Sequence, residues 1–155
     1  MTQRYVDHEN KTISDVRTGL MWQESYAYIE TGNNISWYDA QDYISRLNQG
    51  KLGGYEDWRL PDRLEIQSLY EIAKPFQSRG KTFFLHIDPV FEFSYGCCFW
   101  TRKTRLSAAL GFEFDMGDIH WYPKGSLNGT VRAVRNNWQP RLMIDQSWAE
   151  ESASS

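Results

Sequence analysis

The clearest hydrophobic pattern along the chain predicts an amphipathic helix after Ser36. Ser36 is a favourable N-cap, because its hydroxyl can accept a hydrogen bond from the first turn of a helix. Gly50 is expected to end the helix. Between these two residues, apolar positions recur at spacings of three and four, as on the buried face of a helix: Trp37, Ala40, Tyr43, Ile44 and Leu47.

A second helix is predicted after Pro61, which ends the segment before it. Asp62 and Glu65 have the spacing of a capping box, in which each side chain bonds the backbone N–H of the other residue. Pro75 marks the expected end of this helix. Its apolar positions are Leu64, Ile66, Leu69, Tyr70 and Ile72.

Strands are predicted before the first helix and in the second half of the chain. Residues 5–16 have the pattern of strand and turn, and Gly19 permits a tight bend before the apolar run 20–22. After Pro75 the best strand candidates are residues 97–101, 109–114 and 130–134, separated by glycine-containing loops. Two helices in the first half and a strand-rich second half predict an α+β fold.

Composition and charge narrow the class of protein. The chain has 155 residues, 41% of them hydrophobic and 15% aromatic, which is enough for one folded core. We expect a single domain over residues 1–138 and a partly disordered extension over residues 139–155. A formal net charge of −3 argues against a general nucleic-acid binder.

The chain carries no predicted membrane or export signal. No apolar run approaches the roughly 20 residues of a membrane span. The first residues lack the apolar stretch of a signal peptide. A cytoplasmic location is therefore expected, or a secreted one if a signal peptide was removed.

The two cysteines, Cys97 and Cys98, are neighbours in the sequence. Consecutive Cα atoms lie about 3.8 Å apart, closer than disulfides usually accept, so two reduced thiols are expected. Reduced thiols suit a reducing compartment. The favoured interpretation is a pair of small buried residues, with redox switching and copper binding as alternatives.

Motifs spread over most of the chain follow the order of a known family. They occupy residues 15–23, 37–40, 52–61, 87–91, 99–101, 112–114 and 129–135. Over residues 5–137 this ordered set resembles the Legionella collagen-like protein (Lcl) C-terminal domain family. The resemblance implies a C-type-lectin-like fold, similar in plan to formylglycine-generating enzymes, with a small twisted, mainly antiparallel sheet and long loops in the second half. Characterised relatives are adhesins for sulfated glycans and diversified variable proteins encoded by retroelements.

The charged residues of these motifs are expected to support the fold. We expect Trp58 to be buried, with Asp57 and Arg59 bonding backbone groups or each other around the ring. Arg132 and Arg135 are separated by an odd number of positions and cannot share one face of a regular strand. At least one of these arginines is therefore expected to pair inside the protein or to lie beyond the strand.

Candidate catalytic groups are sparse. His8, His86 and His120 lack metal-ligand spacing, and the chain has no phosphate-binding loop, nucleophile elbow or four-cysteine zinc pattern. Formylglycine-generating enzymes use a spaced cysteine pair near the end of the domain, and Cys97-Cys98 departs from that pattern. We therefore expect no enzyme activity, with a metal- or thiol-dependent enzyme as an alternative.

Asp115 and Asp118 are weak candidates for a calcium site. They flank Gly117 in a short loop, where their carboxylates could offer oxygen ligands. The loop lacks the density of acidic residues found in an EF-hand, and solvated carboxylates are the favoured interpretation. No other cofactor is expected.

The best binding candidate is the predicted loop region between Trp100 and Asn128. It holds three positive charges within four residues and a run of three aromatic rings. Exposed rings beside basic groups can stack on sugars or partner side chains and pair with sulfates or carboxylates. An ordinary basic loop with Trp121 in the core explains the pattern equally well. The candidate ligand-binding residues are Trp100, Arg102, Lys103, Arg105, His120, Trp121, Tyr122 and Lys124.

Together these features predict a non-enzymatic recognition module. Its partner is expected to be a protein or an anionic glycan such as a sulfated one, with no nucleic acid and no membrane involved. A retroelement-diversified variable binding protein is the main alternative within the binding class.

Overall fold

The computed structural model describes residues 3–71, 76–78, 81–83, 86–93 and 98–136. It has the predicted α+β composition. In chain order the elements are β1 (Tyr5–Asp7), β2 (Thr12–Asp15), β3 (Leu20–Gln23), α1 (Ala27–Thr31), α2 (Trp37–Gln49), the 3-10 helix η1 (Leu52–Gly54), α3 (Arg63–Gln67), β4 (Phe76–Ser78), β5 (Lys81–Phe83), β6 (Cys98–Arg105), β7 (Ala108–Phe112), β8 (Ile119–Pro123), β9 (Gly129–Thr130) and β10 (Val134–Arg135).

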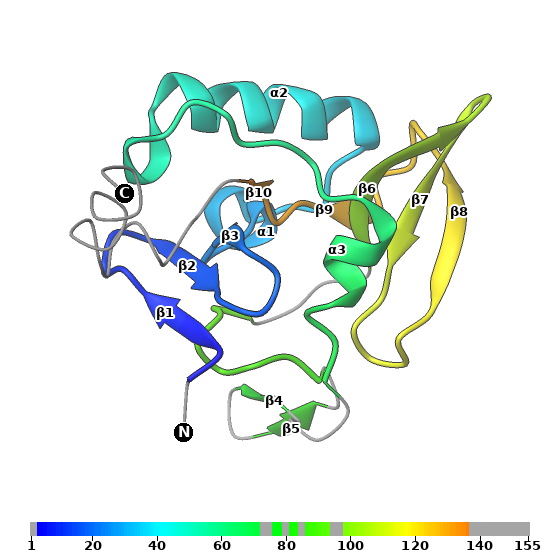
Figure 1. Cartoon of the computed structure of the whole chain (residues 1–155). Coiled ribbons are helices and arrows are strands. Elements are labelled where there is room, and N and C mark those ends of the chain that lie inside the picture. Colours follow the sequence, from blue (N-terminus) through cyan, green and yellow to red (C-terminus); the bar gives the residue numbers. More distant parts are fainter. Residues whose placement is uncertain (1–2, 72–75, 79–80, 84–85, 94–97, 137–155) are drawn as a thin grey trace, which may run out of the picture.

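Two four-stranded sheets form the framework, and both depend on the end of the described chain. The first has the strand order β1-β2-β3-β10, with Val134 of β10 opposite Trp22 of β3. The second has the order β8-β7-β6-β9, in which β9 pairs with β6 in parallel and the other pairs are antiparallel. In Figure 1 the two sheets lie side by side, with α2 running across the top of the view. A separate antiparallel pair, β4 and β5, completes the strands.

The first predicted helix is confirmed as α2. The hydroxyl of Ser36 accepts a hydrogen bond from the Asp39 N–H at 3.1 Å, and the Asp39 carboxylate accepts one from the Ser36 N–H at 3.3 Å. Gly50 ends the helix, as the sequence predicts. Ala40 and Tyr43 are buried, which confirms the inward-facing stripe.

The second predicted helix, α3, starts where expected but is much shorter. Asp62 and Glu65 form the predicted capping box, yet the helix ends at Gln67. The Ser68 hydroxyl donates to the Glu65 carbonyl at 2.6 Å, and the Ser68 carbonyl accepts from Arg4 at 2.9 Å. Backbone groups that would continue the helix are thus bonded elsewhere, and the expectation of a helix reaching toward Pro75 is wrong. Ile72 and Pro75 lie outside the described residues, as do Cys97 and the predicted extension 139–155.

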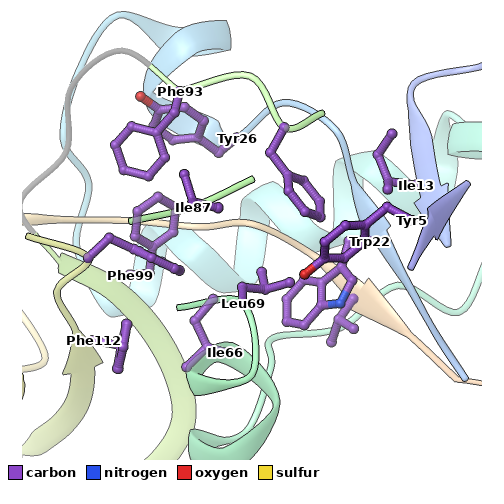
Figure 2. Close-up of a cluster of buried hydrophobic side chains, with 13 residues drawn as sticks. Tyr5, Ile13, Trp22, Tyr26, Ile66, Leu69, Ile87, Phe93, Phe99 and Phe112 are labelled. Carbon is purple, nitrogen blue, oxygen red and sulfur yellow. The ribbon is translucent and has the colours of Figure 1, made fainter. Parts of the chain in front are cut away.

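A cluster of aromatic and aliphatic side chains from both sheets, α3 and residues 87–93 forms a hydrophobic core. Figure 2 shows Ile66 and Leu69, from α3 and the turn after it, in the same cluster as Trp22 and Phe99. Its rings meet mostly edge to face or tilted, as aromatic pairs prefer, for example Phe99 and Phe114 at 5.3 Å and 87°. Leu64, by contrast, is 76% exposed and points away from this core.

The Asp57-Trp58-Arg59 motif supports the fold, and its charged residues bond a backbone carbonyl and two other charged side chains. Trp58 is buried, and its indole N–H donates to the Leu52 carbonyl at 3.0 Å. Asp57 accepts from Arg135 at 2.6 Å, while Arg59 donates to both Glu65 carboxylate oxygens at 2.7 Å. Arg59 also donates to the Leu60 carbonyl at 3.1 Å, which confirms the expected bonding to a backbone group. The alternative, that Asp57 and Arg59 bond each other, is wrong, because Arg135 and Glu65 take those places.

Arg132 lies fully buried between β9 and β10. Its guanidinium donates to the carbonyls of Gln23 (3.0 Å), Glu24, Ser25 (2.9 Å) and Glu92 (2.8 Å). It also lies 5.0 Å from the ring centre of Phe91 and 5.1 Å from that of Tyr26. Burial lowers the pKa of Arg132 to about 10, so the side chain keeps its charge at neutral pH. Internal pairing of at least one arginine is confirmed, since Arg135 also pairs internally.

Two further observations bear on the sequence predictions. Cys98 is buried, as expected for a small core residue. Its thiol lies 3.7 Å from the Asn128 carbonyl. In the part of the chain that the structure describes, no helix has both the length and the apolar surface needed to cross a membrane.

Replacing Arg132 should destabilise the protein more than any change of a surface arginine. Arg132→Ala removes a donor from four backbone carbonyls, of which that of Glu24 keeps the Glu92 N–H at 3.0 Å. The cost is about 1–3 kcal/mol for each carbonyl that stays buried and unpaired. We expect a loss of at least about 3 kcal/mol in the free energy of unfolding, measured by urea denaturation. Arg132→Lys, which keeps the charge with fewer donors, should lose less.

The matched control is Arg17→Ala, which removes an exposed arginine from the turn before β3. It should change the free energy of unfolding by no more than about 0.5 kcal/mol. Equal losses in Arg132→Ala and Arg17→Ala would contradict the role assigned to Arg132.

Acid should weaken the fold through Glu65. Burial alone would raise the pKa of Glu65, but hydrogen bonds from Arg59 and the Asp62 N–H, with the charges of Arg59 and Arg102, hold it below its usual value. A depressed pKa in the folded state contributes stability above the unfolded pKa, about 4.3, and that contribution is lost as pH falls through the folded value. Glu65→Gln should therefore be less stable than the wild type at pH 7.

The difference in melting temperature between Glu65→Gln and the wild type should shrink as pH falls toward about 3. Glu56→Gln is the control, because Glu56 pairs with Lys51 at the exposed surface and such pairs contribute little. A gap between wild type and Glu65→Gln that stays constant with pH would count against the assignment.

Candidate functional site

An open groove of about 650 Å³ lies between α3 and the sheet formed by β6, β7 and β8. We call it the α3–β8 groove. Figure 1 shows α3 beside this sheet, and a backbone hydrogen bond from the Arg102 N–H to the Pro61 carbonyl, at 2.9 Å, ties the two walls together. The groove is lined by Asp62, Arg63, Leu64, Arg102, Lys103, Thr104, Leu110, Ile119 and Trp121.

Strand pairing decides which aromatic residue of β8 reaches the groove. Leu110 of β7 lies opposite Trp121 of β8, and neighbouring residues of a strand point to opposite faces of the sheet. Trp121 therefore borders the groove, while His120 and Tyr122 lie on the other face. Trp121 is only partly buried, so the alternative that places it in the core does not hold.

The groove is rich in positive charge. Arg63, Arg102 and Lys103 line it together with a single carboxylate, that of Asp62. Arg102 lies 3.3 Å from Asp62, but its side chain is 58% exposed, and such exposed pairs are weak. The guanidinium of Arg102 can therefore exchange this partner for a ligand anion at little cost.

Arg105 does not line the groove but contacts Trp121, which does. Its guanidinium lies 4.5 Å from the centre of the Trp121 ring, within the range of a cation–π contact. It ends β6, directly before the turn of the hairpin that joins β6 to β7. The contact holds an aromatic face and a positive charge next to each other at the surface.

Trp100 does not belong to this surface, and the prediction that it contacts a ligand is wrong. It is fully buried, and its indole N–H donates to the Ile35 carbonyl at 2.9 Å. Gly129 packs so closely against it that a Cβ there would lie 2.2 Å from the indole nitrogen. Trp100 is thus a core residue that holds β6 against β9.

The remaining predicted residues lie on the far face of the sheet, in or next to a strand and not in a loop. Five consecutive pairs with β7 make residues 119–123 a regular strand. Tyr122 packs edge to face against Trp100 and donates to Glu113 at 2.5 Å. Lys124, just after the strand, lies 5.1 Å from the centre of the Trp37 ring. The structure therefore divides the candidate set between two faces.

The two acidic residues of the candidate calcium loop, Asp115 and Asp118, have different neighbours. Asp118 comes together with Glu113 and His120, and one ligand atom from each lies within 4.8 Å of the others. The Asp115 carboxylate instead accepts from the neighbouring Met116 N–H at 2.8 Å and is not part of this group. Among the described residues, this is where carboxylate and imidazole groups gather as a metal site requires.

The sequence alone does not indicate the α3 wall of the groove or part of its sheet wall. The capping box at Asp62 locates the start of α3, but nothing in that pattern says which strand the helix faces. Glu113 was missed too, although its spacing to Asp118 is that of residues flanking a hairpin turn. The lining residues that were not predicted are Asp62, Arg63, Leu64, Thr104, Leu110 and Ile119.

The fold and the groove define a small α+β domain with an open groove that is both basic and apolar. The family model of the Lcl C-terminal domain matches residues 11–135, so the chain belongs to the Lcl C-terminal domain family, as its motifs indicate. No curated protein sequence matches the chain.

Replacing Trp100 and Trp121 should have very different effects on stability. Trp100→Ala removes a fully buried ring and should cost about 3–5 kcal/mol, as for other large core rings. Trp121→Ala changes a partly exposed ring and should cost less than about 1 kcal/mol. Urea unfolding followed by circular dichroism measures both. Similar losses in the two variants would place Trp121 in the core.

Proposed function

We propose that this chain is a non-enzymatic recognition module that binds an anionic ligand in the α3–β8 groove. The observation that carries the proposal is the convergence of Arg63, Arg102 and Lys103 with the ring of Trp121 along one open groove. These side chains come from α3, β6 and β8, so the fold itself brings them together.

The groove offers two kinds of contact that act on the same ligand. Arginine guanidinium groups can donate two parallel hydrogen bonds to a sulfate or a carboxylate. The Trp121 ring, with Leu110 and Ile119 behind it, gives a flat apolar surface on which a sugar ring can stack. A sulfated sugar presents both features, an apolar ring face and an anionic group, a few ångströms apart.

The local charge supports an anionic ligand because it opposes the charge of the whole chain. The chain has a formal net charge of −3, whereas the groove has three cationic side chains and one carboxylate. Ligand binding of this kind should weaken with salt, since ions screen interactions between exposed charges.

We favour a sulfated glycan over an acidic protein segment as the ligand. The resemblance to adhesins for sulfated glycans supports this choice, and the open shape of the groove suits a linear chain that enters from solvent. An acidic protein segment would use the same guanidinium groups but would gain less from the exposed ring.

We also propose that the fold is of the C-type-lectin-like kind. The supporting features are the tryptophan at the start of α2, the Leu60-Pro61 junction before α3, and the Val134-Arg135 pair that closes the first sheet as β10. These features occupy the places in the chain that the family resemblance gives them.

Binding to a sulfated oligosaccharide should depend on the groove. Isothermal titration calorimetry with a heparin-derived hexasaccharide should detect binding by the wild type. The double variant Arg63→Ala/Arg102→Ala should weaken binding at least about tenfold, because it removes two charge-assisted contacts. Trp121→Ala should weaken it by a similar factor, as loss of an aromatic anchor does at other binding surfaces.

Two controls make the result specific. Arg17→Ala removes an exposed arginine far from the groove in sequence and should bind like the wild type. A non-sulfated hexasaccharide of the same backbone should bind weakly or not at all. Equal binding by the wild type and both groove variants would overturn the proposal, and capture of an acidic peptide but no glycan would change the ligand class.

A further inference from the structure

The far face of the β7–β8 hairpin holds a second group of polar side chains that the proposed function does not use. Glu113, Asp118 and His120 lie there with one ligand atom each within 4.8 Å of the others. We propose that these three residues bind one divalent transition-metal ion of the Zn²⁺ type. The site is separate from the α3–β8 groove and does not depend on what the groove binds.

The register of the hairpin places the three ligands on one face. Phe112 pairs with Ile119, and the Glu113 N–H donates to the Asp118 carbonyl at 2.9 Å, so Glu113 and Asp118 continue the ladder as the next pair. His120 lies opposite Gly111, two residues before Glu113 on β7. Alternate residues share a face, so Glu113 points to the same side as Asp118 and His120.

The turn between the strands fixes this arrangement. Gly117 has φ of +72°, a conformation that favours glycine, and its N–H donates to the Glu113 carbonyl at 3.0 Å. A Cβ at this position would lie 2.9 Å from the ring of Tyr70. The turn is therefore packed against the body of the protein, which keeps Glu113 and Asp118 next to each other.

The distances suit a small ion after modest side-chain rotation. Zinc binds carboxylate oxygen and imidazole nitrogen at about 2.0–2.2 Å, so tetrahedral ligand atoms lie about 3.4 Å apart. Ligand atoms within 4.8 Å must therefore approach one another by at most about 1.4 Å. Asp118 and His120 are exposed at the surface, so their side chains have room to make this adjustment.

The chemistry of the set favours a transition metal over calcium. Imidazole nitrogen binds Zn²⁺, Ni²⁺ and Cu²⁺ well, whereas Ca²⁺ takes six to eight oxygen ligands. Two carboxylates and one imidazole leave at least one coordination position for water or an external ligand. The proposed set shares only Asp118 with the calcium candidates Asp115 and Asp118 that the sequence offers.

An outer hydrogen bond orients one of the ligands. The Tyr122 hydroxyl donates to one oxygen of Glu113 at 2.5 Å, which leaves the other oxygen for the metal. Such outer partners of metal ligands fix their orientation, and their loss typically costs about 10- to 100-fold in metal affinity. Tyr122 thus acts as a positioning residue for the proposed site.

Calorimetric titration of the chelator-treated 155-residue chain with ZnCl₂ tests the proposal. We expect one equivalent of Zn²⁺ to bind. His120→Ala and Asp118→Asn should each weaken binding at least about tenfold, and Tyr122→Phe should weaken it about tenfold while keeping the ring packing. Asp115→Asn is the matched control, because it changes a carboxylate in the same loop that lies outside the set.

Titration with CoCl₂ gives a second readout. Visible absorption bands should appear with the wild type and Asp115→Asn and be lost with His120→Ala, while circular dichroism checks that each variant is folded. No Zn²⁺ binding by the wild type, or binding that His120→Ala and Asp118→Asn leave unchanged, would overturn the proposal. Because the hexasaccharide test uses variants on the opposite face, either proposal can fail without the other.

Discussion

The guanidinium of Arg132 is held by backbone carbonyls from two separate segments, residues 23–25 and Glu92, inside a ring of aromatic side chains. A buried charge is costly unless hydrogen bonds replace its water. Here the two terminal nitrogens donate to four carbonyls and three aromatic rings surround the group, whereas Nε is buried without a hydrogen-bond partner. Arg132 lies between β9, which pairs with the second sheet, and β10, which pairs with the first. The position of one sheet relative to the other therefore depends on the hydrogen bonds that the Arg132 guanidinium makes.

The same junction positions the sheet that forms one wall of the α3–β8 groove. β9 runs parallel to β6, and Trp100 of β6 packs against Gly129 of β9, so the second sheet is anchored from its buried side. From the other side, the backbone bond between Arg102 and Pro61 holds β6 beside the start of α3. The outward-facing residues of the sheet can then be polar, because the inward-facing residues already fix its place. The buried contacts stabilise the sheet, so the cationic side chains of the groove can contribute little to stability.

How much the sequence predicts depends on whether the determining contacts are local. The start and end of α2 and the start of α3 follow from caps within a few residues, and all were predicted. The early end of α3 was not, because Arg4 bonds the Ser68 carbonyl from a distant part of the chain. Trp100 and Trp121 look alike in sequence, and only the pairing of β6, β7 and β8 separates the core ring from the surface ring. For the same reason the sequence alone does not bring Glu113, Asp118 and His120 together, because their proximity follows from the hairpin register.

An NMR titration can show whether an anionic ligand contacts the α3–β8 groove. In ¹H–¹⁵N spectra each tryptophan indole N–H gives its own signal, so one experiment reports on rings throughout the protein. Adding a sulfated hexasaccharide should move the Trp121 indole signal and the backbone signals of Arg63 and Arg102, and leave those of buried Trp22 and Trp58 in place. Shifts confined to signals outside the groove, with the Trp121 signal unchanged at saturation, would contradict the account.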